Sequence, residues 1–466
     1  MTTAPEQLSA GLVLRPDGLA DQQARVGAGG VELSGGRPAS FRPASDLDRA
    51  DGNYFVEGLP VEIHCHSMGD VDFSDFRDLD LPALDAVAAA EGVACVPTVY
   101  LAREKLSEFV AFMRRFDELR RRGALPFVPA IALEGPLLAS HGGTPASTVW
   151  PPTRAEWEQL AGCGPLGLAY VVISPDGLTK DSDLHDRLGR EHPDLPWIVR
   201  TLVESGVRPA LGHYTKLEPK RAAELTYEIV DIAWQTESPI VGARVVTDHL
   251  FNDMPLTIKH AFRTRKARAE RDALIAAYDL PSWNLADLPE QVGDVPAAIM
   301  RLCHEGKVAS CINFDSEHVD LAIAARAVEV IGEGRVMLMT DRCDAARLGG
   351  QQLHREAENT LWYQDGGVVA AGSQPLDRQL QNARRAGVSE GRLWDLVSFT
   401  AYTTLGLDRD PWLNPARTGS FLSVAGEPSD GRPSYTRHAV VASAPVLDAD
   451  RTDARHDRHP VVVSQA

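Results

Sequence analysis

Val61-Glu62-Ile63-His64-Cys65-His66 is an apolar run that ends in two histidines separated by one residue. In a β-strand, alternate side chains point to the same face, so His64 and His66 would lie together while Cys65 faces the other way. Two imidazoles in this arrangement can bind one metal ion. The run therefore predicts a strand with half of a metal site at its carboxyl end.

Four further apolar runs also carry a residue that can bind a metal or move a proton. The parallel strands of a barrel bring their carboxyl ends to one face, where such barrels have their active sites. If these runs are strands of one barrel, their polar residues converge with the two histidines. The residues are Glu134 after Ile131-Ala132-Leu133, His213 after Leu211-Gly212, His249 in Asp248-His249-Leu250, and Asp341 after Met339-Thr340.

Strand candidates alternate with helical periods between about residues 59 and 410, which predicts an α/β fold with a (β/α)8 barrel. Helical periods span 101–122, 197–205, 219–234 and 319–331, among others. The eight strand candidates are 61–66, 93–98, 127–133, 168–173, 207–212, 243–249, 308–314 and 336–341.

The two chain ends differ from this pattern. Residues 1–58 and 411–447 carry short apolar pieces among Gly and Pro, and they predict the two parts of a small β domain around the barrel at 59–410. Residues 448–466 lack apolar periodicity, so we expect a mobile tail. The connection from about 254 to 301 is long and contains a basic helical stretch, which predicts a lid or specificity element.

Composition narrows the partners and the location. With Lys+Arg 47 against Asp+Glu 65, the net charge of -18 argues against nucleic acid as the main partner. The chain shows neither a signal-peptide pattern nor an apolar run of membrane-spanning length, so we expect no membrane contact and a cytoplasmic location. The six cysteines are scattered without a Cys-x-x-Cys pair and are expected to be reduced thiols.

A hydrolytic metal site needs imidazoles and a carboxylate to hold the cation, and a base to accept a proton from water. A single histidine at a strand end is more often a surface or hydrogen-bonded core residue. The whole set is a stronger signal, because five strand-end placements agree. The candidate ligands are His64, His66, Glu134, His213 and His249, and the candidate base is Asp341.

The chain also resembles the N-acetylglucosamine-6-phosphate deacetylases of the amidohydrolase superfamily. The resemblance spans about residues 53–410 in the family's order, and it implies a distorted (β/α)8 TIM barrel with a small β-sandwich built from both chain ends. Its most specific motifs are Leu133-Glu134-Gly135-Pro136 and His249-Leu250-Phe251-Asn252, supported by 58–66, 97–98, 206–213, 315–319 and 340–341.

This resemblance implies roles for individual residues. The principal metal would be bound by Glu134, His213 and His249, and a second metal, present in some family members, by His64 and His66. Asp341 would be the general base and acid. One or two divalent ions are implied, with zinc expected first and iron or manganese as alternatives, and the protein would be a homodimer. Two substrate contacts are implied at Asn252 and His318.

Among the departures from the family's pattern, two concern histidines. An arginine that helps to clamp phosphate usually lies eleven residues after the motif histidine, where this chain has His260. Histidine is largely neutral at pH 7 and lacks the bidentate guanidinium, so we expect a weakened preference for phosphate. The substrate-polarising histidine usually follows the motif glutamate by about a dozen residues, whereas the nearest candidate here, His141, follows Glu134 by seven.

The expected function is removal of an N-acetyl group from an amino sugar. Hydroxide on the cation would attack the amide, while Asp341 takes the water proton and passes it to the leaving amine. A deaminase or cyclic amidase acting on a non-phosphorylated substrate remains open, because the same barrel supports several reactions. A catalytically silent sensor or binding relative also remains open. Acetate release separates the first two, and bound metal without turnover would favour the third.

Overall fold

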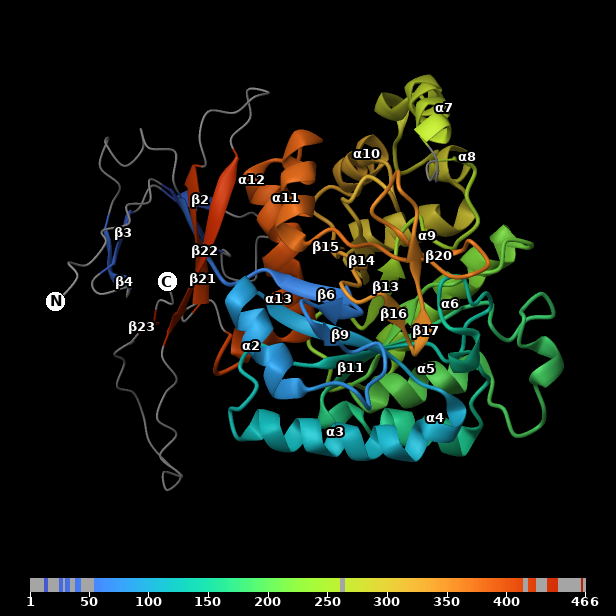
Figure 1. The fold of residues 1–466 in the computed structure, drawn as a ribbon. Helices are drawn as coiled ribbons and strands as arrows, with labels where there is room; N and C mark the ends of the chain where they lie inside the picture. The colour runs from blue at the N-terminus through green and yellow to red at the C-terminus, as the bar shows by residue number, and fades with distance from the viewer. Residues whose placement is uncertain are drawn as a thin grey trace.

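The computed structural model describes residues 12–15, 25–27, 30–33, 38–42, 54–259, 265–413, 418–424, 434–442 and 462–463. Eight parallel strands form one sheet that curls into a nearly closed barrel (Figure 1), which confirms the predicted fold class. His260 lies outside the described residues, as does the predicted mobile tail except for Val462–Val463.

Each barrel strand pairs with the next strand along the chain. Both faces of these strands are buried, which explains their nearly continuous apolar sequences. All eight fall within or beside the predicted ranges: β6 (Val61–Cys65), β9 (Ala94–Tyr100), β10 (Ile131–Glu134), β11 (Leu168–Ile173), β12 (Arg208–Leu211), β13 (Val245–His249), β14 (Val308–Ile312) and β15 (Val336–Leu338).

The first and last barrel strands meet just beyond the carboxyl end of β15. The backbone N–H of His66 donates to the carbonyl of Arg342 at 2.8 Å, and that of Asp341 donates to the carbonyl of His64 at 3.1 Å. This closure brings the backbone of the predicted base directly against the His-x-His pair.

Helices cover the outside of the barrel (Figure 1). The predicted helical periods form α3 (Leu106–Arg121), α5 (Leu195–Glu204), α6 (Pro219–Gln235) and α10 (Leu321–Ile331). The side chain of Asp194 accepts from the N–H of Trp197 and so caps α5. Other helices are α2 (Leu81–Glu91), α4 (Arg154–Ala161), α11 (Leu376–Arg385), α12 (Glu390–Trp394) and α13 (Thr400–Leu405).

Both chain ends contribute to a six-stranded sheet beside the barrel (Figure 1). Arg437 joins this sheet to the barrel, because it donates to the carbonyl of Gly92 at 2.7 Å and to Asp377 at 2.8 Å. These strands fit a small extra domain, while its boundaries at 58, 410 and 447 stay predictions. The sheet order is β2 (Arg25–Gly27), β1 (Leu12–Arg15), β5 (Tyr54–Glu57), β21 (Thr418–Val424), β22 (Tyr435–Ala442) and β23 (Val462–Val463), and β3 (Gly30–Leu33) pairs separately with β4 (Pro38–Arg42).

Two connections at the carboxyl ends of the strands are long. The β13–β14 connection carries α7 (Arg265–Ala277), α8 (Leu288–Val292) and α9 (Asp294–His304), and α7 stands out from the barrel in Figure 1. The β15–α11 connection carries five short strands that were not predicted from the sequence: β16 (Arg347–Leu348), β17 (Gln351–Gln352), β18 (His354–Arg355), β19 (Trp362–Tyr363) and β20 (Val369–Ala371).

No helix in the described part of the chain is both long enough and apolar enough to span a membrane.

Candidate metal centre and active site

A cavity of about 770 Å³ opens at the carboxyl ends of the barrel strands. Its floor is polar, and its walls, formed by 251–259, Leu361 and 368–370, carry apolar side chains beside a few polar ones. Lys216 and Lys259 are the lysines among the described lining residues. The predicted site residues on the floor are His66, Glu134, His213, His249, His318 and Asp341.

The two histidines of β6 converge on the floor. His64 Nε2 lies 3.2 Å from Glu134 Oε2, and His66 Nε2 lies 3.4 Å both from that oxygen and from Asp341 Oδ1. His66 Nδ1 lies 3.1 Å from the carbonyl oxygen of Thr98. A carbonyl only accepts, so this bond places a proton on Nδ1 and leaves His66 Nε2 available to a cation.

Glu134 at the end of β10 links these histidines to the opposite side of the floor. Its Oε2 faces the β6 pair, while its Oε1 lies 3.3 Å from His213 Nε2. The hydroxyls of Thr144 and Tyr100 donate to Oε1 and Oε2 respectively. Burial alone would raise the pKa of Glu134, but the adjacent imidazoles of His213 and His64 hold it well below its usual range. The carboxylate is therefore ionised.

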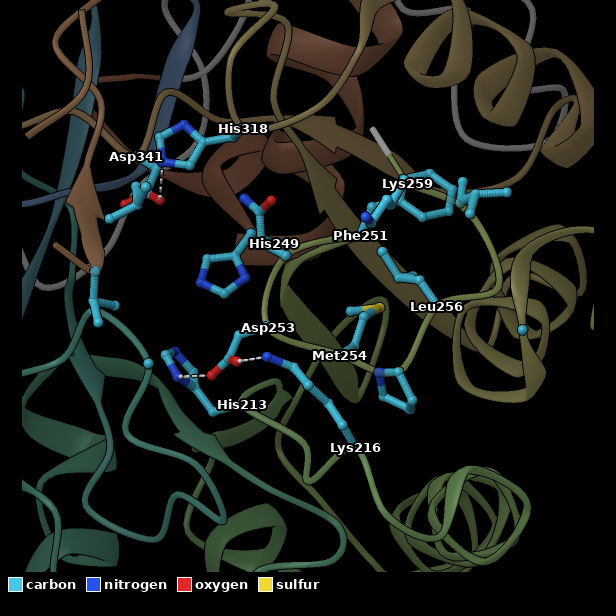
Figure 2. Close-up of a pocket in the computed structure, with 18 of the residues that line it drawn as sticks. His213, Lys216, His249, Phe251, Asp253, Met254, Leu256, Lys259, His318 and Asp341 are labelled. Atoms are coloured by element: carbon cyan, nitrogen blue, oxygen red, sulfur yellow. Dashed lines mark ion pairs between the residues drawn. The ribbon is translucent and has the colours of Figure 1, made fainter. Parts of the chain in front are cut away.

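His213 is oriented by a carboxylate behind it. Asp253 Oδ2 lies 3.2 Å from His213 Nδ1, and Lys216 Nζ lies 3.1 Å from Asp253 Oδ1, as Figure 2 shows. A carboxylate on one ring nitrogen fixes the tautomer that offers the other nitrogen to a metal. His213 and Asp341 also have positive φ values of 54° and 50°, a conformation that is uncommon for non-glycine residues.

Asp248 joins the cluster, although it is absent from the predicted ligand set. Strand alternation from His249 would turn Asp248 to the opposite face. A β-bulge changes this. Val246 pairs with Ala309 and His249 pairs with Cys311, so the pairing advances by three residues along β13 but by only two along β14. No sequence pattern marks the bulge.

Two groups in this cluster have the composition of metal sites, namely His64, His66 and Asp341, and His213, Asp248 and His249. His213 Nε2, His249 Nδ1 and both oxygens of Asp248 are buried, and none makes a hydrogen bond of good geometry with the described residues. Leaving such atoms unpaired is costly, and a cation would satisfy them. Imidazoles with carboxylates are suitable ligands for a divalent metal, so the residues fit one.

Excess negative charge surrounds the histidines. Burial alone would lower the pKa of His64, but Asp248 and Glu134 raise it to about 9. The buried carboxylates therefore attract positive charge, whether as protons on the imidazoles or as a cation between them.

Asp341 and His318 face each other across the floor (Figure 2). His318 Nε2 lies 3.4 Å from Asp341 Oδ2, and His318 Nδ1 contacts Asp315 Oδ2 at 2.5 Å. Burial alone would raise the pKa of Asp341, but its hydrogen bond with His66 and the nearby His318 lower it on balance. Asp341 is therefore an ionised carboxylate that can accept a proton.

Neither a known protein family nor a curated protein matches the sequence of this chain. Solved structures do match. The N-acetyl-D-glucosamine-6-phosphate deacetylase of Mycobacterium smegmatis, as a variant in complex with N-acetyl-D-glucosamine-6-phosphate, is 18% identical with a TM-score of 0.60, covering 93% of this chain and 98% of its own. The Pasteurella multocida enzyme of that name is 14% identical with a TM-score of 0.59, covering 91% and 97%. The Thermotoga maritima enzyme is 15% identical with a TM-score of 0.57, covering 86% and 90%.

This chain has the fold of N-acetylglucosamine-6-phosphate deacetylases. The expected resemblance is thereby confirmed at the level of the fold, and the roles of individual residues rest on the geometry described above.

The remaining predicted residues take different places in this deacetylase fold. Asn252 lines the cavity, and its Nδ2 donates to Asn313 Oδ1 at 3.3 Å. His141 lies beside Gly142, which lines the cavity, but is not itself a lining residue. All six cysteines are free thiols, and Cys65 Sγ lies 3.9 Å from Cys95 Sγ.

Proposed function

We propose that this protein is a metal-dependent amidohydrolase that removes an acyl group, acetyl in the first place, from the nitrogen of an amino sugar or a related small molecule. One observation carries the proposal: a cluster suited to a cation and an ionised carboxylate, Asp341, lie together on the floor of one cavity. Hydrolysis of an amide requires both, because water must be activated and the leaving nitrogen must be protonated.

The roles follow from the positions of the side chains. A divalent cation would lower the pKa of water and polarise the substrate carbonyl. Asp341 is held through both oxygens, with Oδ1 facing His66 and Oδ2 facing His318. It would take a proton from water and return it to the leaving nitrogen, as microscopic reversibility favours. The cation would be held by His64, His66, Glu134, His213 and His249.

Two further residues would bind the substrate. His318 is oriented by Asp315 through Nδ1, so its Nε2 points toward the floor beside Asp341. Asn252 lies on the cavity wall, close to His249 in sequence. A cavity of about 770 Å³ is large enough for a monosaccharide derivative.

The apolar wall favours a second candidate function. Phe251, Met254 and Leu256 lie on one side of the cavity, and Val369 and Ala370 also line it (Figure 2). Such walls also suit deamination or cyclic-amide hydrolysis of a substrate without phosphate.

The test is a set of turnover assays on the metal-loaded protein. N-acetylglucosamine-6-phosphate, N-acetylglucosamine and a panel of cyclic amides and amino-heterocycles would be assayed for acetate, ring opening and ammonia. Acetate from either sugar supports the proposal, whereas ring opening or ammonia without acetate supports the second candidate. Bound metal with no turnover on any amide would contradict both. Asp341→Asn on the same substrates shows whether the observed turnover belongs to this site.

A further inference from the structure

We propose that Asp248, a residue to which the resemblance gives no role, is a metal ligand that lies between the two divalent cations that the resemblance allows. The inference deepens the proposed function. It rests on one part of that proposal, which is that the site binds metal. It adds a carboxylate on β13 to the ligands predicted from the sequence.

The contacts of Asp248 point to a cation. Its Oδ2 lies 3.0 Å from His213 Nε2 and 3.3 Å from His249 Nε2, while its Oδ1 lies 3.6 Å from His64 Nδ1. The side chain is fully buried, and neither oxygen makes a hydrogen bond of good geometry with the described residues. A buried carboxylate is stable only when paired or coordinated, and the atoms around Asp248 are metal-binding nitrogens.

The fold makes room for this side chain in two ways. The bulge in β13 turns Asp248 inward, and the hydroxyl of Thr247 accepts the N–H of Cys311 at 3.1 Å within the bulge. On the neighbouring strand end, a Cβ on Gly212 would lie 2.7 Å from the Cβ of Asp248. A glycine beside the bulge therefore lets the carboxylate fit between the histidines.

Glu134 and Asp248 each face both halves of the cluster. Glu134 directs Oε2 to His64 and Oε1 to His213, while Asp248 directs Oδ1 to His64 and Oδ2 to His213. Four imidazoles and three carboxylates converge here, more than the four ligands that a structural zinc accepts or the three protein ligands of a usual catalytic zinc. Two cations use this set, one near His64, His66 and Asp341 and the other near His213 and His249.

The experiment counts ions and measures their coupling. The full chain would be stripped with a chelator and titrated with Mn²⁺ alone, with binding read by equilibrium dialysis and electron paramagnetic resonance. We expect two Mn²⁺ per chain and the spectrum of a coupled pair. Asp248→Asn should lower the affinity for one of them by at least about a hundredfold, since even partners of metal ligands affect affinity 10- to 100-fold.

Asp85→Asn is the matched control. Asp85 lies on α2, where its Oδ1 accepts the N–H of Phe127 at 2.7 Å, and this change removes one carboxylate without touching the cavity. It should bind two Mn²⁺ with native affinity. If Asp248→Asn does not fold, Asp248→Ser would be used in its place. The number of Mn²⁺ ions bound by the native protein, and their coupling, test the inference without any variant.

Two results would overturn the inference: one Mn²⁺ per native chain, or two bound to Asp248→Asn with native affinity. Acetate release by a native protein with a single ion would leave the proposed function standing and remove this inference. Two coupled ions without turnover on any amide would support this inference and contradict the proposed function.

Discussion

Asp341 is the residue on which turnover should depend most directly. Replacing it with Asn keeps the shape of the side chain, but an amide cannot accept the water proton at pH 7. We expect kcat to fall at least about a hundredfold. Acetate release would be measured alongside metal content, which should stay at one cation or more per chain. Near-native turnover would rule out Asp341 as the base.

Asp253 should act through His213 rather than on the substrate. Burial alone would raise its pKa, but His213 and Lys216 lower it to about 2, so the carboxylate is charged. Asp253→Asn should weaken metal binding about 10- to 100-fold, as loss of a ligand's partner commonly does. Competition with a chelator measures this. Lys216→Gln is the control, because it keeps the contact between Asp253 and His213; an equal loss in both variants would contradict the role.

The sequence was sufficient to predict residues at strand ends, but not every residue of the site. His66, Glu134 and Asp341 could be placed because a barrel gathers strand ends at one face whatever the details of packing. Asp248 could not, because a bulge reverses alternation and is set by the register between β13 and β14. Asp253 lies in a loop and has a positive φ of 40°, which no periodicity in the sequence predicts.

Among the elements, the turns after β11 and β12 are linked by the buried side chain of Asp176. Asp176 Oδ2 accepts the backbone N–H of Thr215 at 2.9 Å and its hydroxyl at 2.8 Å. Burial raises the pKa of Asp176 to about 6, above its usual 3.8. The folded state therefore binds this proton more tightly than the unfolded state. Its contribution to stability is fully present below about pH 4 and is lost as the pH rises through 6.

Asp176→Asn keeps an oxygen for Thr215 and removes the charge. Relative to the native protein, the variant should gain up to about 3 kcal/mol in free energy of unfolding between pH 4 and pH 7, since each unit of pKa shift corresponds to about 1.4 kcal/mol. Urea unfolding of both proteins at the two pH values measures this. A difference that does not change with pH would contradict the raised pKa.

Long and short elements differed in how well they could be predicted. The eight barrel strands are buried apolar runs, so composition alone marks them. Strands β16 to β20 have two or three residues each, and β17 and β18 are polar and largely exposed. They depend on tertiary contacts: Gln364 donates to the carbonyl of Gly143, and a Cβ on Gly143 would lie 2.4 Å from the carbonyl oxygen of Val369. Short strands that depend on such tertiary contacts leave no local pattern in the sequence.

In the molecule as a whole, the candidate reacting groups and the walls of the cavity come from different parts of the fold. The floor of the cavity comes from strand ends of the rigid barrel, whereas its walls come from the two long connections after β13 and β15. Under the proposed function, the reacting groups would stay fixed while the connections would determine which amine is accepted. Of the two lysines that line the described part of the cavity, Lys216 is paired with Asp253 at 3.1 Å, so Lys259 is the other positive charge on the walls.

The histidine at position 260 predicts a small preference for a phosphorylated sugar. His260 stands where the resemblance places a phosphate-clamping arginine, so kcat/KM for N-acetylglucosamine-6-phosphate and for N-acetylglucosamine should differ little. His260→Arg should raise the ratio on the order of tenfold or more, because charge-assisted hydrogen bonds contribute roughly 1.5 to 3 kcal/mol each. His354→Arg on β18, outside the cavity lining, adds the same charge elsewhere and should leave the ratio unchanged. A strong native preference that disappears when Arg263, Arg265 and Lys266 are neutralised would contradict this expectation, because basic residues of the β13–β14 connection would then supply the phosphate contacts.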